Sequence, residues 1–202
     1  MTYPPEPWYL GGSLLASAFL VDGAWFRDAV PAGRHPLRWG SKVVVGVASA
    51  SYGPGGVLAY EELLVALPTW GRGGLRITIP QIWVDSPASQ AGGRELWGIP
   101  KQLAVFERSA TDASMNSTEV QLEGSAGRGL LPGMRQLPLP ILQPVEGGSI
   151  LSHNRVIGRI RSLCARWSFA ADGPLDYLTG HRPFFSFAVS DASIIFGMDV
   201  QR

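Results

Sequence analysis

The sequence predicts a mostly β fold, a single-domain β-barrel or sandwich with a few short helices that spans residues 1–202. Two observations lead to this expectation. The chain contains 25 glycines and 16 prolines among 202 residues. Together they make up about a fifth of the chain, against an average of about 12%, and they lie dispersed between short apolar runs. No internal repeat and no linker divides the chain. Dispersed turn residues between short runs are typical of strands joined by tight connections.

Most of these runs have the length and composition of strands. They cover residues 13–21, 42–52, 75–84, 117–126, 156–170, 183–190 and 192–200.

Three runs have less regular patterns. In residues 75–84, apolar and polar side chains alternate up to Pro80, and a proline at that place indicates a sheet edge or a bulge. Residues 156–170 are long enough for a strand bent across two sheets, although a helix is also compatible. Residues 59–68 fit a strand or a helix, and the proline at the end predicts an early stop. Only residues 22–30 and 172–180 otherwise indicate short helices.

The charge balance indicates a protein that acts on or binds small molecules. Formal net charge is +1 and 46% of the residues are hydrophobic, so no strong field favours nucleic acid or an anionic membrane. The amino terminus lacks the basic and apolar regions of a signal peptide, and no window reaches the length of a membrane helix. We expect a cytoplasmic homo-oligomer that binds neither nucleic acid nor membrane.

Cysteine and histidine offer little chemistry. Cys164 is the only cysteine, so no disulfide can form within the chain. It lies in the apolar stretch SLCARWSF, where we expect a buried and inert thiol. His35, His153 and His181 are far apart and show no metal-ligand spacing. We therefore expect no metal and no cofactor.

One stretch, GGRELWGIPK at residues 92–101, ends in an unusual residue. Only Lys42 and Lys101 among the 17 basic residues are lysines. A lysine amine is a nucleophile only when neutral, and burial in an apolar pocket disfavours the ammonium. Apolar residues surround Lys101 in sequence, Pro100 stiffens the approach, and Gly98 allows close passage to another surface. An ordinary surface lysine after a turn is the alternative.

The stretch GGRELWGIPKQLA resembles the active-site segment of the acetoacetate decarboxylase superfamily, which reads Gly-Arg-Glu-Leu, a few variable residues, then Pro-Lys. The resemblance extends to PPEPWYLGGSLLASAFLV, GPGGVLAYEELLVAL and RPFFSFAVSDASIIFG, and so covers most of the chain. It implies the acetoacetate decarboxylase-like β fold, with Lys101 as the lysine that forms a Schiff base with a ketone. It also implies that Glu62, the second acid of AYEE, is the pocket carboxylate that moves protons.

Three departures from the family pattern concern charge. Decarboxylases of the family carry an arginine in the amino-terminal strand, where this chain has Ser13, Leu14 and Leu15. They carry a further glutamate ahead of the pocket acid, where this chain has Gly46 and Val47. A second lysine often follows the catalytic one, and here the next residue is Gln102. Desolvation is then the remaining way to favour a neutral amine.

Further residues are candidates for substrate binding. Glu61 and Glu62 point to opposite faces if they lie on a strand, and the resemblance implies that Glu62 is the one that faces inward. Trp97, Pro100 and Gln102 flank Lys101. Arg159 and Arg161 would share a strand face with Leu163 and Trp167, and an inward arginine could hold a substrate carboxylate. A solvated arginine pair is the alternative.

Two classes of function remain. The first is a Schiff-base-forming lyase that acts through Lys101 on a β-keto or related carbonyl substrate. The missing charges favour an aldolase, dehydratase or cyclase of secondary metabolism over a true acetoacetate decarboxylase. The second is a non-catalytic small-molecule binding protein on the same fold.

Overall fold

A computed structural model describes residues 2–108, 115–117 and 120–202. The sheet is formed by β1 (Trp8–Val21), β2 (Arg34–Pro36), β3 (Arg38–Trp39), β4 (Lys42–Tyr52), β5 (Tyr60–Gly71), β6 (Gly74–Val84), β7 (Lys101–Leu103), β8 (Phe106–Arg108), β9 (Met115–Ser117), β10 (Val120–Gly129), β11 (Arg135–Val145), β12 (Gly148–Phe169) and β13 (Phe185–Gln201). The helical elements are η1 (Gly23–Ala29), α1 (Pro87–Trp97) and η2 (Asp176–Leu178), and η1 and η2 are 3-10 helices.

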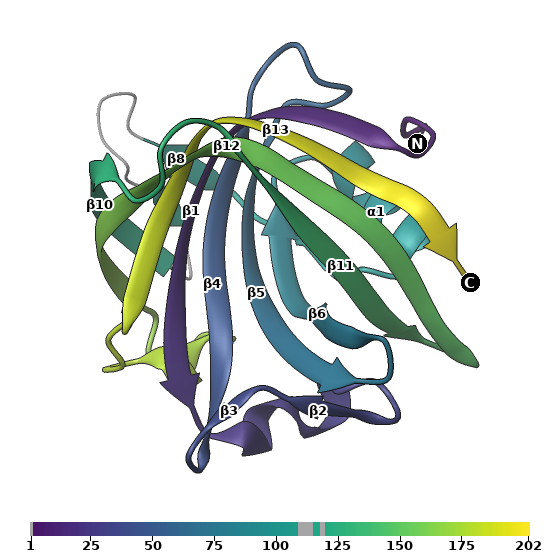
Figure 1. The fold of residues 1–202 in the computed structure, drawn as a ribbon, viewed down its shortest axis with the longest axis horizontal. Helices are drawn as coiled ribbons and strands as arrows, with labels where there is room; N and C mark the ends of the chain where they lie inside the picture. Colours follow the sequence, from purple (N-terminus) through teal and green to yellow (C-terminus); the bar gives the residue numbers. More distant parts are fainter. Residues whose placement is uncertain (1, 109–114, 118–119) are drawn as a thin grey trace.

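The long strands close into a ring. Neighbours follow the order β11-β6-β5-β4-β1-β13-β12, and β12 returns to pair with β11. The strands curve around a common interior, and α1 lies at one end beside both termini (Figure 1). Arg202 contacts Glu6 and the carbonyl of Leu96, which holds the two termini against this helix. The mostly β prediction is therefore confirmed, with a sandwich-like or barrel-like arrangement of strands.

Several predicted strands have nearly the bounds of the observed strands, and others are shorter than the observed ones. Residues 42–52 form β4 as predicted. The segment 59–68 is a strand, but β5 continues beyond Pro68 to Gly71. The bulge expected at Pro80 is confirmed, because the pairing of β5 with β6 shifts register between Val65 and Leu67, opposite that proline.

The carboxyl-terminal half brings the larger differences. The bent strand predicted at 156–170 is the second half of β12, which pairs with β10, β11 and β13. The two runs at 183–190 and 192–200 form one strand, β13, which passes through Asp191 at a φ of 51°. Residues 118 and 119 of the predicted strand 117–126 lie outside the described residues.

Two apolar clusters fill the space around the ring. One contains Phe19, Val45, Leu67 and Trp167, and the helical segment η1 packs against it through Phe26. The other contains Trp8, Trp97, Ile82 and Ile141, among others. None of the helices in the described ranges is long and apolar enough to cross a lipid bilayer.

Candidate active site

Strand β5 brings an acid to the interior of the ring. Successive residues of a strand face opposite sides, so Tyr60 and Glu62 point inward while Glu61 points outward. Glu62 is 5% exposed. Glu61 instead accepts a hydrogen bond from Ser51 Oγ, and its backbone N–H donates to Asp85. The expectation that Glu62 is the inward acid is confirmed.

Helix α1 and the turn that follows it position Lys101. Ser86 caps the helix by accepting from the N–H of Ser89, and Pro87 occupies the first turn. Gly98 ends it with a φ of 65°, a left-handed conformation that glycine adopts without steric cost. The chain then turns so that β7 begins at Lys101 and pairs with β6. Arg94 in the last turn of the helix donates from Nε to the carbonyl of Lys101, with an N···O distance of 2.7 Å.

The two glycines of the GGREL stretch permit two close contacts. A Cβ added at Gly93 would lie 2.6 Å from Cδ of Lys101, and one added at Gly92 would lie 2.5 Å from the ring of Trp8. Carbon atoms normally pack at about 3.5–4.0 Å. The lysine stem and the tryptophan ring therefore occupy the space that side chains at these two positions would fill.

The lysine amine has three polar neighbours. Lys101 is 4% exposed, and its Nζ donates to Glu62 Oε2 at 2.8 Å, to Ser89 Oγ at 2.9 Å and to Tyr60 OH at 3.4 Å. The amine also lies 5.1 Å from the centre of the Tyr60 ring. The expected burial of Lys101 is confirmed, whereas Lys42, the only other lysine, is exposed at the start of β4.

Two tyrosines complete the polar cluster. The hydroxyl groups of Tyr52 and Tyr60 donate to the two carboxylate oxygens of Glu62, and their rings lie 4.6 Å apart. Burial raises the pKa of both phenols well above the ordinary value of 10.0, and the charge of Glu62 raises it further. Both tyrosines are therefore neutral hydrogen-bond donors at physiological pH.

This burial predicts a loss of stability in alkali. Below pH 10 both phenols keep their protons in the folded and the unfolded chain, so they add no pH dependence. Above about pH 10 the unfolded chain releases these protons and the folded chain does not, so the free energy of unfolding falls by up to about 1.4 kcal/mol per pH unit for each tyrosine. Urea unfolding between pH 9 and 11.5 measures the slope. Tyr52→Phe should reduce it, while Tyr9→Phe, which removes an exposed phenol, should leave it unchanged. A slope that Tyr52→Phe does not alter would contradict this account.

The polar cluster lies at one end of an apolar cavity of about 240 Å³. Lys101, Glu62, Tyr52 and Tyr60 are the polar groups at this end. The remaining lining is almost entirely apolar and includes Trp8, Leu10, Leu14, Ile77, Ile79, Ile82, Trp97, Ile99, Ile141 and Ile194. The rings of Trp8 and Trp97 meet edge to face at 4.8 Å. Trp97, expected beside Lys101, thus lines the same cavity.

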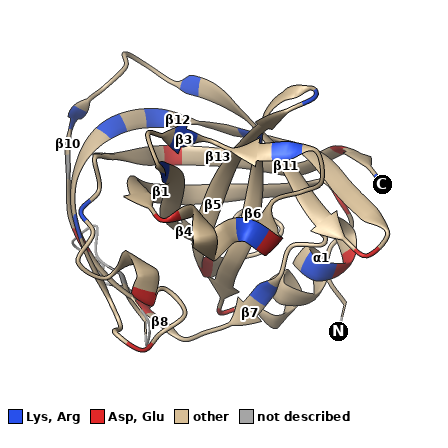
Figure 2. Cartoon of the chain, turned by 90° about the horizontal axis from the view of Figure 1, so that it is seen from below, with Lys and Arg blue, Asp and Glu red and all other residues tan. Residues whose placement is uncertain are grey.

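Four other predicted binding residues lie elsewhere. Gln102 is exposed, and Pro100 lines a separate hollow with Gln143 and Tyr177. Arg159 and Arg161 are both exposed on β12, along which Figure 2 shows several basic positions. Arg159 pairs with Asp191 across 3.3 Å.

The inward interpretation of the two arginines is wrong because the strand changes face. Buried residues on β12 alternate as far as Ile160, and the alternation then resumes at Leu163, one position out of phase. The pairing of β10 with β12 also shifts register here, between Ala126 and Gly129. The arginines therefore do not share the inward face of Leu163. The same alternation corrects the prediction for Cys164, which is exposed because its neighbour Leu163 points inward.

Sequence reasoning missed Ser89, Tyr52 and Tyr60. Tyr60 stands two positions before Glu62, and this strand spacing is a signal that it shares the inward face. Tyr52 pairs directly with Tyr60 across β4 and β5, which only the strand register reveals. Ser89 lies on a helix that the sequence did not predict.

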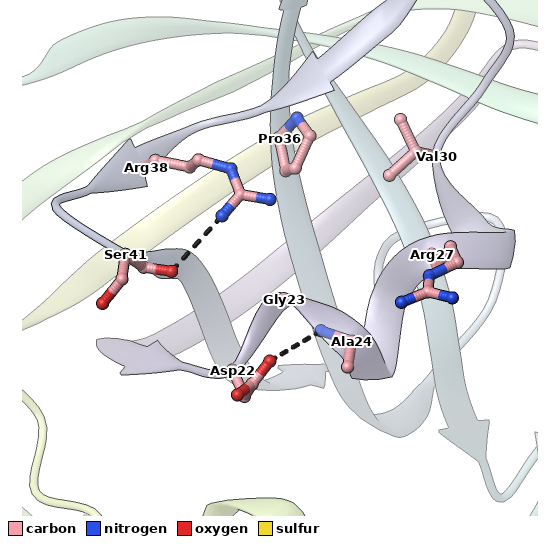
Figure 3. A pocket seen from close by; sticks show the side chains of 8 residues that line it. All are labelled: Asp22, Gly23, Ala24, Arg27, Val30, Pro36, Arg38 and Ser41. Carbon is pink, nitrogen blue, oxygen red and sulfur yellow. Dashed lines mark hydrogen bonds between the residues drawn. The ribbon is translucent and has the colours of Figure 1, made fainter.

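A further hollow is lined by exposed polar side chains. It lies beside η1 and β3 and is lined by Asp22, Arg27, Arg38 and Ser41, among others (Figure 3). Asp22 accepts from the N–H of Ala24, and Arg38 donates to the carbonyl of Ser41. These side chains are exposed, so they lack the desolvated environment of the Lys101 cluster. Within the described ranges, no three His, Cys, Asp or Glu side chains gather in a group that could hold a metal ion.

Comparisons with known proteins bear on the family and the fold of the chain. The family model for acetoacetate decarboxylase (ADC) matches residues 1–126. A search of curated protein sequences gives no match. The acetoacetate decarboxylase of Legionella pneumophila has a similar fold, with a TM-score of 0.69 and 16% identity over 98% of this chain and 87% of that one.

Two further structures are similar to this chain. The enduracididine biosynthesis enzyme MppR, solved in complex with pyruvate, has a TM-score of 0.65 and 18% identity over 98% of this chain and 88% of that one. An acetoacetate decarboxylase-like enzyme from Sphingomonas wittichii RW1 has a TM-score of 0.62 and 15% identity over 96% of this chain and 91% of that one. At these identities the structures establish the fold, and the family model covers more than half of the sequence. The chain belongs to the acetoacetate decarboxylase family.

Proposed function

We propose that this protein is a Schiff-base-forming enzyme of the lyase type that condenses Lys101 with a carbonyl substrate. The observation that carries the proposal is the contact of 2.8 Å between the Lys101 amine and Glu62 at the buried end of an apolar cavity. A nucleophilic amine with an adjacent base is the arrangement that covalent catalysis requires.

The pair can supply the free amine within the site. Glu62 Oε2 can accept one proton from the Lys101 ammonium, which leaves a neutral amine beside a neutral carboxylic acid. Few charges are stable in an apolar cavity, and this transfer removes both charges of the pair. The amine then attacks the carbonyl carbon, and the carbonyl oxygen leaves as water after it takes protons from the amine and from Glu62.

The iminium that results withdraws electrons from the adjacent carbon. A C–H or C–C bond at that carbon can then break with its electron pair moving toward nitrogen, and Glu62 can accept the released proton. The resulting enamine is a carbon nucleophile. It can attack a second carbonyl group, and a water molecule can subsequently leave. Hydrolysis of the imine releases the product and restores Lys101.

The lining favours aldol, dehydration or cyclisation chemistry over decarboxylation. Among the described residues, no arginine or histidine lines the cavity, so the charged side chains that a substrate carboxylate would meet are Lys101 and the acid Glu62. Leu14 and Gly46 line it in the two regions where the family pattern has charged residues. MppR, of similar fold, has been solved with the condensation product of pyruvate and imidazole 4-carboxaldehyde. We infer a role of the same broad kind, in secondary metabolism.

Borohydride trapping tests this function. The protein is incubated at neutral pH with a panel of ketones and aldehydes, reduced, and analysed by intact mass. We expect one reduced adduct for each chain with at least one carbonyl compound. Tight binding of these compounds without any reduced adduct would instead favour a non-catalytic binding protein.

Replacing Gly93 by alanine should displace Lys101 without unfolding the protein. The new Cβ forces the lysine stem to move by about 1 Å, and a misplacement of this size can lower a reaction rate by about 10²-fold. Alanine also favours the helix by about 1 kcal/mol relative to glycine, so thermal stability should be largely retained.

The control for this variant is Gly148→Ala, because a Cβ at Gly148 has no atom within 4 Å. The rate of trapping should be normal in the control and reduced in Gly93→Ala. Equal trapping rates in the two variants would show that the packing of Gly93 against the lysine stem is irrelevant to the chemistry.

A further inference from the structure

The cavity continues away from Lys101 along a face of unusually small residues. Ala18 of β1 pairs with Gly46 of β4, and Gly46 pairs with Ala66 of β5, so three small residues stand in register on neighbouring strands. One level closer to Glu62, Ala16 and Ala48 are paired in the same way. All five residues line the cavity.

The opposite face of the same strands is filled with large side chains. Phe19, Val45, Val47, Val65 and Leu67 alternate with the small residues and are 0% exposed. Protein interiors are normally packed as densely as organic crystals. The five small residues Ala16, Ala18, Gly46, Ala48 and Ala66 therefore stand on the side of the sheet that faces the cavity, where they leave space for a ligand.

The register gives the length of this space. Ala66 follows Glu62 on the same strand face, with Leu64 between them, and all three line the cavity. Four residues of extended chain cover about 13 Å. A zigzag hydrocarbon chain with bonds of about 1.5 Å needs on the order of ten carbons to span that distance. Glu62 is buried, whereas Leu64, Gly46 and Ala66 are half-buried, so the path leads from the polar end toward solvent.

The lining also disfavours any charged group on the ligand. Lys101 and Glu62 are the charged residues among those that line the cavity in the described structure, and they are paired with each other. A ligand carboxylate placed along the small-residue face would meet Leu14, Leu64, Ile77 and Phe187. An unpaired buried carboxylate is strongly unfavourable.

From these observations we infer the substrate class: an uncharged carbonyl compound with an apolar chain of on the order of ten carbons. Its carbonyl carbon lies at Lys101 Nζ, and its chain follows the face formed by Ala16, Ala18, Gly46, Ala48 and Ala66. This inference rests on the proposed function for the position of the carbonyl. The location of the chain depends only on the cavity.

A series of 2-alkanones from 2-butanone to 2-undecanone tests the chain. The concentration that gives half-maximal borohydride trapping should fall by about three- to fourfold for each added methylene. From 2-butanone to 2-nonanone the expected total is about 10²- to 10³-fold. Trapping that does not depend on chain length would overturn the substrate class and leave the Schiff-base function intact.

Levulinate and 2-pentanone form a matched pair for the charge. Both are methyl ketones of the same chain length, and levulinate carries a carboxylate where 2-pentanone carries a methyl group. Levulinate should need at least about 100-fold more ligand for equal trapping, because the apolar face offers its carboxylate no partner. Equal or better trapping of levulinate would overturn the uncharged class.

Ala66→Leu locates the chain within the cavity. The added side chain occupies the far end of the small-residue face, so the preference for 2-undecanone over 2-nonanone, about tenfold in the wild type, should disappear. Ala171→Leu is the control, since Ala171 is exposed outside the strands, and it should keep the full preference. An undiminished preference in Ala66→Leu would show that the chain lies elsewhere.

A parallel measurement separates this inference from the proposed function. Binding of 2-alkanols, which cannot form an imine, is followed by calorimetry over the same chain lengths. If no ketone is trapped but alkanol affinity rises with chain length, the apolar ligand stands and the Schiff-base function fails. If neither ketones nor alkanols show a chain-length dependence, the substrate class fails.

Discussion

Lys101→Arg abolishes borohydride trapping with every carbonyl compound while the fold is retained, and this is the largest effect that we expect. Arginine keeps a positive charge beside Glu62, but its guanidinium remains protonated at any working pH and cannot form an imine. Trapping should fall below detection by intact mass. Circular dichroism and thermal unfolding should show a folded protein.

Two comparisons sharpen this prediction. Lys42→Arg removes the only other lysine, which is exposed at the start of β4, and should trap ketones like the wild type. Lys101→Ala should lose trapping and also stability, because it leaves Glu62 buried without its partner, a change that costs about 3–5 kcal/mol. Labelling of Lys101→Arg to the wild-type level would mean that the chemistry occurs at another amine.

Glu62→Gln should lower proton transfer by about 10²- to 10⁴-fold, the usual contribution of a general base. The substrate need not be known for this test. An iminium acidifies the neighbouring C–H bond, so the enzyme should exchange these hydrogens of a ketone for deuterium in heavy water, which NMR follows directly. The glutamine side chain can still accept a hydrogen bond from Lys101 but cannot take up a proton, so exchange should be lost. Desolvation then remains the only factor that favours the neutral amine, so trapping should be slower but still detectable.

Glu61→Gln is the matched control for this variant. Glu61 is adjacent in sequence but faces away from the cavity, where it accepts from Ser51. Exchange should therefore continue in Glu61→Gln. Loss of exchange in this control, with normal exchange in Glu62→Gln, would identify Glu61 as the base and contradict the proposed roles.

The sequence was most informative where one local rule decides the outcome. Alternation on a strand places Glu61 and Glu62 on opposite faces, and the resemblance selects Glu62 as the inward residue. The strand pattern of residues 42–52 needs no distant contact for its interpretation. Burial of Lys101 was predictable from the resemblance of the segment around it. Its apolar neighbours alone left a surface lysine as the alternative, and two of them, Leu103 and Val105, are exposed.

Helix α1 escaped prediction because local and tertiary preferences disagree. Gly92 and Gly93 disfavour a helix by about 1 kcal/mol each relative to alanine. Their value is visible only in three dimensions, where they make room for the ring of Trp8 and the stem of Lys101. With the helix missed, Ser89 could not be placed next to the amine.

Strand β11 was missed for a related reason. Pro138, Pro140 and Pro144 argue against a strand, because proline cannot donate to a ladder. The three prolines stand an even number of residues apart, so their missing N–H groups all belong to one side of the strand. β11 pairs with β12 along its whole length on one side, but its partner on the other side is β6, at Ile141. The ring therefore tolerates proline at the weakly paired junction.

Peptide mapping of the reduced adduct tests the central claim most directly. Wild-type protein is trapped with 2-nonanone at neutral pH, reduced, digested with trypsin and sequenced by mass spectrometry. Lys101, Lys42 and the terminal amine compete in one sample, so no variant is needed. The account predicts that the added mass lies on Lys101, where the modification also blocks cleavage, and that Lys42 is unmodified. An adduct on Lys42 or the terminal amine, with Lys101 free, would contradict the account.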